Sequence, residues 1–141
     1  MDTILQALRG AIESQDADRV EKALGQAFAA GLSPILVPTL IELLGFPWHT
    51  RHEDVARALQ ELKSPAAVPA LKRAATTIHP YLNYDEFFGL ARKCTWALAD
   101  IGTLEAKTAL QELSEASNPL VAGYAKKRID NWTQEMGRKS A

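Results

Sequence analysis

The chain has 141 residues, 47% of them hydrophobic, and its 16 Lys and Arg residues nearly balance 17 Asp and Glu residues, giving a net charge of -1. This length and apolar content suit one domain with its own core, and the balanced charge offers no overall basic field for nucleic acid phosphates. The start of the chain lacks a secretory signal, and no apolar run reaches the length of a membrane span. We therefore expect a cytoplasmic protein without nucleic acid or membrane partners.

Helical periodicity runs through almost the whole chain, and two-residue alternation is missing. Apolar residues recur at spacings of three and four, which places them on one face of a helix. Such stripes occupy residues 4–12, 20–28, 55–62, 68–78, 90–101, 106–113 and 121–132. Together with the segment at 33–44, they predict an all-α protein of about eight helices joined by short turns.

One phrase occurs twice, 31 residues apart, as Ser33-Pro-Ile-Leu-Val-Pro-Thr-Leu40 and Ser64-Pro-Ala-Ala-Val-Pro-Ala-Leu71. Each copy begins with a serine that suits an N-cap and a proline that suits the first helical position. The second proline, Pro38 or Pro69, lies one turn further on and should bend the helix or delay its start. A fixed period between 20 and 50 residues is typical of stacked repeats.

The period is broken once. Residues 58–62 align with 97–101 at a shift of 39, whereas residues 91–101 align with 122–132 at a shift of 31. Eight extra residues, His79–Glu86, therefore lie between the second helix of one repeat and the first helix of the next. A whole inserted loop is more often functional than decorative.

The two aligned motifs identify a family resemblance. Ser64–Leu71 and Ala97-Leu-Ala-Asp-Ile-Gly-Thr-Leu-Glu-Ala106 resemble the two halves of the short HEAT repeat, in the version found in phycobilisome-lyase-type HEAT proteins. The resemblance covers roughly Asp16 to Trp132 and implies an α-solenoid, or superhelix, of helical hairpins. It implies one domain over 1–141, with a capping helix at 1–15, repeats at 16–132 and a C-terminal tail at 133–141. The second helices, about 33–44, 65–78 and 103–116, would line the concave side.

In such a solenoid the turns at 45–54 and 79–86 should be neighbours on one edge, and they contain all three histidines of the chain. A rim rich in His, Tyr, Trp and Arg has the composition of protein-binding hot spots. We therefore predict that it binds a partner protein. The candidate contact residues are Trp48, His49, Arg51, His52, His79, Tyr81, Tyr84 and Asp85 on the rim, with Lys72 and Arg73 on a concave helix.

Each rim residue also has a structural interpretation. Thr50 and Glu53 fit a capping box, and Asn83 or Asp85 fits a cap for the helix that follows the insertion. The rim's aromatic side chains could instead seal the gap between repeats, and Trp96, opposite its helix's core stripe, is either packed or an exposed anchor.

Metal binding or catalysis is the more specific alternative to protein binding. His49, His52 and His79 could supply three zinc ligands, with Asp85 as a fourth, but no H-E-x-x-H pattern is present. Cys94 occupies the apolar stripe of its helix and resembles a buried hydrophobe more than a nucleophile. Phosphate-binding loops and G-x-S-x-G motifs are also missing. We therefore expect no catalytic activity, no cofactor and no resident metal.

These observations predict a non-catalytic protein-binding module. The chain also resembles small bacterial HEAT proteins that act as immunity proteins, which implies a toxin as its partner. Two alternatives stay open: a general scaffold or adaptor, and a lyase-type or chromophore-handling protein, as the repeat family implies.

Overall fold

The computed structural model describes residues 2–132, and within this range the fold is all-α with no strand. The eight α-helices are α1 (Asp2–Ser14), α2 (Ala17–Ala30), α3 (Val37–Gly45), α4 (His52–Leu62), α5 (Val68–Ala75), α6 (Gly89–Ile101), α7 (Leu104–Leu113) and α8 (Pro119–Asp130). Three 3-10 turns lie at Pro34–Leu36, Pro65–Ala67 and Pro80–Leu82. The predicted tail at 133–141 lies outside the described residues. None of the described helices combines the length and the apolar content that crossing a membrane requires.

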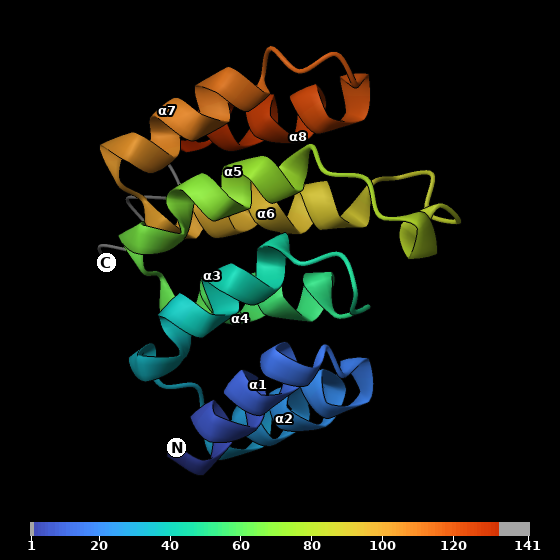
Figure 1. Ribbon diagram of the computed structural model, residues 1–141. Coiled ribbons are helices and arrows are strands. Elements are labelled where there is room, and N and C mark those ends of the chain that lie inside the picture. The colour runs from blue at the N-terminus through green and yellow to red at the C-terminus, as the bar shows by residue number, and fades with distance from the viewer. Residues whose placement is uncertain (1, 133–141) are drawn as a thin grey trace.

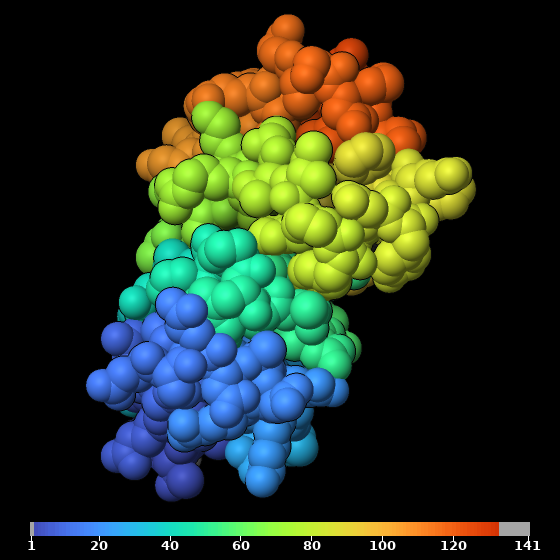
Figure 2. Space-filling model, turned by 45° about the vertical axis from the view of Figure 1, so that its right-hand side comes forward, coloured from blue at the N-terminus to red at the C-terminus, as the bar shows by residue number. Residues whose placement is uncertain are grey.

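The helices form a two-layered stack (Figure 1). α1, α3, α5 and α7 contact one another in sequence within one layer, and α2, α4, α6 and α8 do so in the other. The space-filling view shows the same order as a column, with the segment between α5 and α6 bulging from one edge (Figure 2). This arrangement confirms the predicted α-solenoid.

The repeated phrase builds the same structure twice. After Ser33 and after Ser64 the chain makes a 3-10 turn, and the α-helix begins only at Val37 or Val68, so the prolines delay the helix start as predicted. The Ser33 hydroxyl accepts a hydrogen bond from the Ile35 N–H (3.4 Å). The side-chain cap predicted at Ser64 is wrong, because a main-chain bond from Ala67 N–H to the Ser64 carbonyl (3.1 Å) holds that turn.

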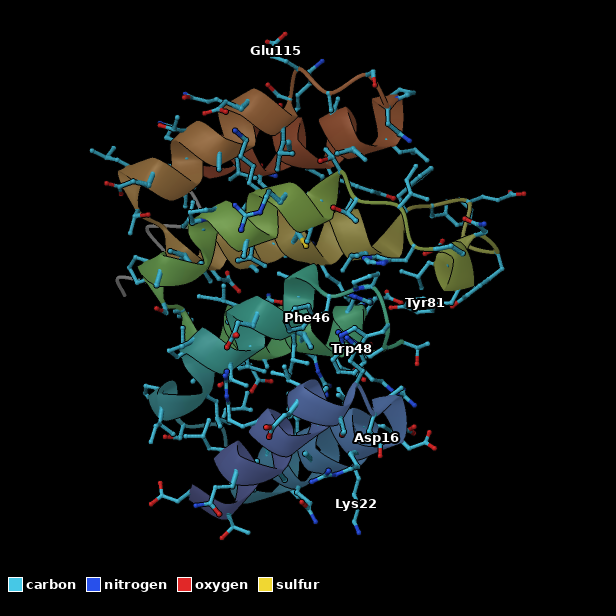
Figure 3. The ribbon with its side chains drawn as sticks, viewed as in Figure 1. Asp16, Lys22, Phe46, Trp48, Tyr81 and Glu115 are labelled. Carbon is cyan, nitrogen blue, oxygen red and sulfur yellow. The ribbon has the colours of Figure 1, made fainter. Side chains whose placement is uncertain are left out.

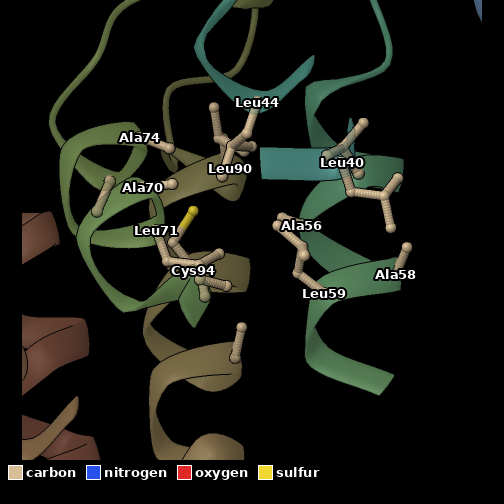
Figure 4. Close-up of a cluster of buried hydrophobic side chains, with 14 of the residues drawn as sticks. Leu40, Leu44, Ala56, Ala58, Leu59, Ala70, Leu71, Ala74, Leu90 and Cys94 are labelled. Carbon is tan, nitrogen blue, oxygen red and sulfur yellow. The ribbon is translucent and has the colours of Figure 1, made fainter. Parts of the chain in front are cut away.

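The core runs the length of the stack, since each layer buries its apolar stripe against the other. Every helix from α1 to α8 contributes fully or nearly fully buried apolar side chains. Figure 4 shows those of α3, α4, α5 and α6 facing one another. Cys94 belongs to this cluster, and burial raises the pKa of its thiol to about 12. It is the small buried hydrophobe that the sequence predicts.

Polar contacts join successive helices of each layer and fix their register. They pair residues at corresponding positions of neighbouring helices, and three of them span 40 residues. The pairs are Arg9–Glu42 and Lys72–Glu112 in the α1–α7 layer, and Gln60–Asp100 (2.8 Å) and Lys93–Glu53 (3.1 Å) in the α2–α8 layer. Exposed ion pairs add little stability, so the packing of the core carries most of it.

Trp96 is packed and not left free in solvent. The guanidinium of Arg128 lies 3.5 Å above its ring, and the ring is half-buried between α6 and α8. Trp132 packs against the end of the core, with the Lys107 ammonium 5.7 Å from its ring centre. Both tryptophans therefore hold neighbouring helices together.

A pair of leucine variants tests the position of the core. Leu98→Ala should lower the free energy of unfolding by about 2–5 kcal/mol, because Leu98 is fully buried and its loss leaves a cavity. Leu104→Ala, at a site 80% exposed, should change it by less than about 0.5 kcal/mol. Urea denaturation measures both, and equal effects would contradict this packing.

Candidate functional site: an inserted loop held by stacked rings

The segment between α5 and α6, residues 76–88, is the candidate site and is called the inserted loop below. It contains the 3-10 turn Pro80–Leu82 and lies beside the turn that joins α3 to α4. Figure 3 shows Tyr81 on the same edge of the stack as Phe46 and Trp48 of that turn. The prediction that the two turns are neighbours is therefore confirmed.

Six rings from the two turns form one continuous series, here called the ring stack. Its three imidazoles lie face to face, with centroids 4.0 Å apart between His49 and His52 and 3.7 Å apart between His52 and His79. Phe46 and Trp48 extend the series at one end (5.8 Å between them, and 5.4 Å from Trp48 to His49), and Tyr81 ends it beside His52 (5.6 Å). The rings thus join residues almost 30 positions apart.

Hydrogen bonds fix the protonation of the two histidines of the α3–α4 turn. Nε2 of His49 lies 2.6 Å from the Leu43 carbonyl, and Nε2 of His52 lies 2.6 Å from the Phe46 carbonyl, so each Nε2 carries a hydrogen and donates. The Nδ1 of His49 accepts from the Arg51 N–H (3.0 Å). Both imidazoles are therefore neutral, with every ring nitrogen in use.

Tyr81 caps helix α4. Its hydroxyl donates to Nδ1 of His52 (2.7 Å) and accepts from the backbone N–H of the same residue (3.2 Å). The predicted capping box of Thr50 and Glu53 is wrong: α4 begins at His52 with no side-chain cap from its own turn, and Glu53 pairs instead with Lys93. The hydroxyl of Tyr81, 29 residues away in the sequence, thus accepts a hydrogen bond from one of the first N–H groups of the helix, which have no partner within it.

Asp85 closes the other end of the inserted loop. Its carboxylate accepts hydrogen bonds from the N–H groups of Phe87 (2.9 Å) and Gly89 (2.8 Å), so it serves the first N–H of α6, although the N-cap position itself is Phe88. Phe88 adopts a left-handed backbone with φ 53°, a conformation that costs a non-glycine residue energy. The Tyr124 hydroxyl of α8 also donates to the Phe87 carbonyl. The loop is therefore fastened at both ends.

Burial divides the predicted rim into two groups. His49, His52 and His79 are 1%, 0% and 5% exposed, so the prediction that they lie open to a partner is wrong. Stacking the rings removes them from water. Trp48, Arg51, Tyr81 and Asp85 are half-buried, and Arg51 pairs with Glu21 (2.5 Å) and Asp54 (3.7 Å).

The exposed group is small and apolar. Tyr84 is 79% exposed, as the sequence predicts, and Phe87 and Ile78 are 71% and 74% exposed. Phe87 and Ile78 are not among the residues predicted to contact a partner. Ile78 fits the helical stripe predicted over 68–78, but α5 ends at Ala75, so Ile78 falls on the inserted loop. Phe87 lies three residues before Leu90, where the predicted stripe of α6 begins, and no pattern in the sequence marked it.

The alternative of a zinc site does not fit the geometry. The ring nitrogens of His49 and His52 are engaged by main-chain groups and by Tyr81, and near-parallel stacked rings direct their lone pairs side by side instead of toward one point. Among residues 2–132, no three His, Cys, Asp or Glu side chains are arranged to hold a metal ion. Nε2 of His79 is buried without a hydrogen-bond partner among these residues.

Burial also sets the acid–base behaviour of the stack. Desolvation lowers the pKa of His52 to about 4 and lowers the pKa values of His49 and His79, because a buried imidazolium loses its hydration. The same effect raises the pKa of Tyr81. All four rings are therefore neutral near pH 7.

A hollow of about 190 Å³ lies beside the inserted loop, between His79, Leu82, Phe88 and Leu90. It shares Ile78 and Phe88 with a second hollow of about 450 Å³, which shares Thr76 and Ala116 with a third of about 500 Å³. The third is lined by Lys72 and Arg73 of α5, by Glu112 of α7 and by Glu115, which follows α7. We call this continuous depression the trough; it runs from the inserted loop onto the α5–α7 face.

Two segments of the chain, residues 53–77 and 90–116, match the family model of the PBS lyase HEAT-like repeat. The chain therefore contains two HEAT-like repeats. The two matches correspond to α4 with α5 and to α6 with α7, and most of the inserted loop falls in the gap between these HEAT-like repeats. No curated protein and no solved structure matches the chain significantly.

Removing one hydroxyl tests the anchor. Tyr81→Phe should lower the free energy of unfolding by about 1–3 kcal/mol, because it leaves a buried His52 nitrogen and a helix N–H unsatisfied. Tyr84→Phe, at an exposed ring with no such bonds, should have almost no effect. Chemical denaturation compares the two variants. A Tyr81→Phe protein with the stability of the wild type would show that the Tyr81 hydroxyl does not hold the inserted loop.

The buried imidazoles should make stability depend on pH. His52 takes up its proton near pH 6.5 when unfolded but only near pH 4 when folded, so the unfolded state binds more protons between these values. Lowering the pH from 7 to 5 should therefore reduce the free energy of unfolding by about 2 kcal/mol through His52 alone. Urea denaturation at both pH values measures this, and equal or greater stability at pH 5 would contradict it.

Proposed function

We propose that this HEAT-like repeat protein is a non-catalytic module that binds another protein through the exposed part of the inserted loop and the adjoining trough. The observation that carries the proposal is the exposure of Ile78, Tyr84 and Phe87 on a loop that is fastened from within. Large apolar side chains gathered in water on one short segment are typical of an interaction surface.

The anchoring of the loop favours binding energetically. A free loop would lose conformational entropy when a partner ordered it, whereas a loop already held by Tyr81 and Asp85 loses little. Tyrosine and other aromatic side chains are also the groups that most often dominate binding energy at interfaces. Tyr84 and Phe87 are therefore the proposed anchors.

The trough supplies the surroundings that such anchors need. Its loop end is apolar, with Ile78 and Phe88, while its far end carries both charge signs, with Lys72 paired to Glu112 and Arg73 beside them. An apolar centre bordered by polar groups is the common anatomy of a protein interface. The predicted contacts at Lys72 and Arg73 belong to this border.

Cys94, His49 and His52 are unsuited to catalysis in this fold, which supports a function in binding. The Cys94 thiol, with a pKa of about 12, is not a thiolate at neutral pH. The neutral rings of His49 and His52 have no free nitrogen with which to accept a substrate's proton.

A narrower form of the proposal names a toxin as the partner, with this chain as its immunity protein. The resemblance to small HEAT immunity proteins supports it. Co-expression with the product of the adjacent reading frame tests it: growth protection and a stoichiometric complex would support this form, and the absence of both would remove it while leaving the general proposal intact.

A double variant tests the general proposal. Tyr84→Ala with Phe87→Ala should weaken capture of the native partner at least tenfold while leaving the melting temperature nearly unchanged, because both rings lie outside the core. Leu104→Ala is the matched control, since it removes an equally exposed apolar side chain from α7. Affinity purification from the source cells, followed by titration, supplies the measurement.

Three outcomes are distinguished. Loss of one stoichiometric partner in the double variant but not in the control supports the proposal. Equal capture by all three proteins contradicts it. Weak capture of many proteins by the wild type alone would favour the scaffold alternative instead.

A further inference from the structure

All three histidines of the chain lie in the ring stack, and none of them is more than 5% exposed. The other buried polar side chains among residues 2–132 are Thr39, Thr95 and Arg128, which keep the same charge between pH 7 and pH 5. The carboxylates in this range are all at least partly exposed. Mild acid therefore charges the described interior at one place, the contact between the α3–α4 turn and the inserted loop.

Each histidine is placed so that an added proton disturbs an existing contact. Nδ1 of His49 accepts from the Arg51 N–H, so a proton there would set two N–H groups against each other. A proton on Nδ1 of His52 would occupy the nitrogen to which the Tyr81 hydroxyl donates. Nε2 of His79 is buried and has no hydrogen-bond partner in the described chain. Charged rings stacked 3.7–4.0 Å apart would also repel one another.

No carboxylate of residues 2–132 bonds to a nitrogen of these three rings, so an imidazolium there has no counter-ion in contact with it. The charged groups of the elements packed around the stack have other contacts. Arg51 of the turn engages Glu21 of α2 and Asp54 of α4, Glu53 of α4 engages Lys93 of α6, Asp85 bonds to main-chain N–H groups, Glu86 is exposed, Glu42 of α3 engages Arg9, Lys72 of α5 engages Glu112, and Arg73 lines the trough.

The inserted loop is the part of this contact that can leave without unfolding a helix. His79 and Tyr81 belong to the loop, which lies between α5 and α6 and outside both, whereas His52 is the first residue of α4. Withdrawal of the loop exposes His79 to water and uncovers the face of His52 on which it stacks (Figure 3). His49 keeps its contacts with Trp48 and His52.

We propose that protonation of His52 and His79 releases the inserted loop from the ring stack while the helices stay folded. Burial lowers the pKa of both rings in the docked state, so the released state binds more protons below pH 6.5. Docking is therefore favoured above pH 6.5 and is lost as the pH falls. At pH 5 a free imidazole is protonated about 30-fold over its neutral form, so freeing two rings favours release by up to about 1,000-fold.

Release would regulate the binding surface, and this consequence rests on the proposed function. Tyr84 and Phe87 are held in one arrangement only while the loop is fastened, so acid should weaken the binding of a partner protein. Release itself is measured on the protein alone. Failure of the proposed function would therefore leave the measurement of release unaffected, and the two failures are distinguishable.

An NMR titration of the full chain from pH 7.5 to pH 4.5 tests the proposal, with far-UV circular dichroism recorded in parallel. Because one movement frees both rings, the signals of His52 and His79 should titrate in one shared step with a Hill coefficient of about 1.5–2. Nuclear Overhauser contacts between the rings of Tyr81 and His52 should disappear in the same step, and the helix content should stay unchanged. His49 should titrate separately and at lower pH.

Two variants should move the midpoint of this step in opposite directions. His79→Phe keeps a ring in the stack but cannot take up a proton, so the midpoint should fall by at least about 0.5 pH unit. Tyr81→Phe loses the hydroxyl that fastens the loop, so its midpoint should rise by a similar amount. Tyr84→Phe, changed at an exposed ring, should keep the wild-type midpoint.

Either shift alone tests the proposal if the other variant does not fold, which melting temperatures at pH 7.5 establish. Separate titration of His52 and His79 with the Tyr81 contacts retained would overturn the proposal. Loss of those contacts only together with helix content, or midpoints unaltered in both variants, would overturn it as well.

Discussion

The pair of hydrogen bonds between the Tyr81 hydroxyl and His52 is the interaction on which the rest of the site depends. It satisfies a helix N–H and a buried ring nitrogen at once, across 29 residues of sequence. By fastening the inserted loop to the start of α4, it brings His79 onto the imidazole stack and leaves Tyr84 and Phe87 in water. The stack's histidines must be neutral to be buried there, so the loop's position and their protonation are one coupled property.

The buried and the exposed aromatic residues of this edge have different roles. The buried rings fill the edge between repeats, where the insertion interrupts the regular packing of helix on helix. The exposed rings have no such task, and their exposure is what sets the loop apart from the surrounding repeats. A rigid foundation beneath a small apolar surface lowers the entropy lost on binding.

Much of the fold was predictable because its signals are local. The twice-used Ser-Pro phrase predicted both delayed helix starts, and the change in spacing from 31 to 39 located the inserted loop. The site was less predictable because its contacts are distant. Thr50 and Glu53 satisfy a local capping pattern, but Tyr81 of the inserted loop occupies that role. The composition of the rim correctly identified which edge of the stack carries the site. Whether a histidine there is buried depends on ring stacking, which the spacing of residues in the sequence does not reveal. Ile78 matched a helical stripe that ended three residues earlier than its periodicity indicated.

Amide hydrogen exchange measured by NMR tests the central claim most directly, because it reports whether the inserted loop is held in solution. The account predicts that the backbone N–H of His52, bonded to Tyr81, and that of Gly89, bonded to Asp85, exchange as slowly as amides of the flanking helices. Exchange of these two amides at the rate of an unstructured peptide, while α4 and α6 remain protected, would contradict it.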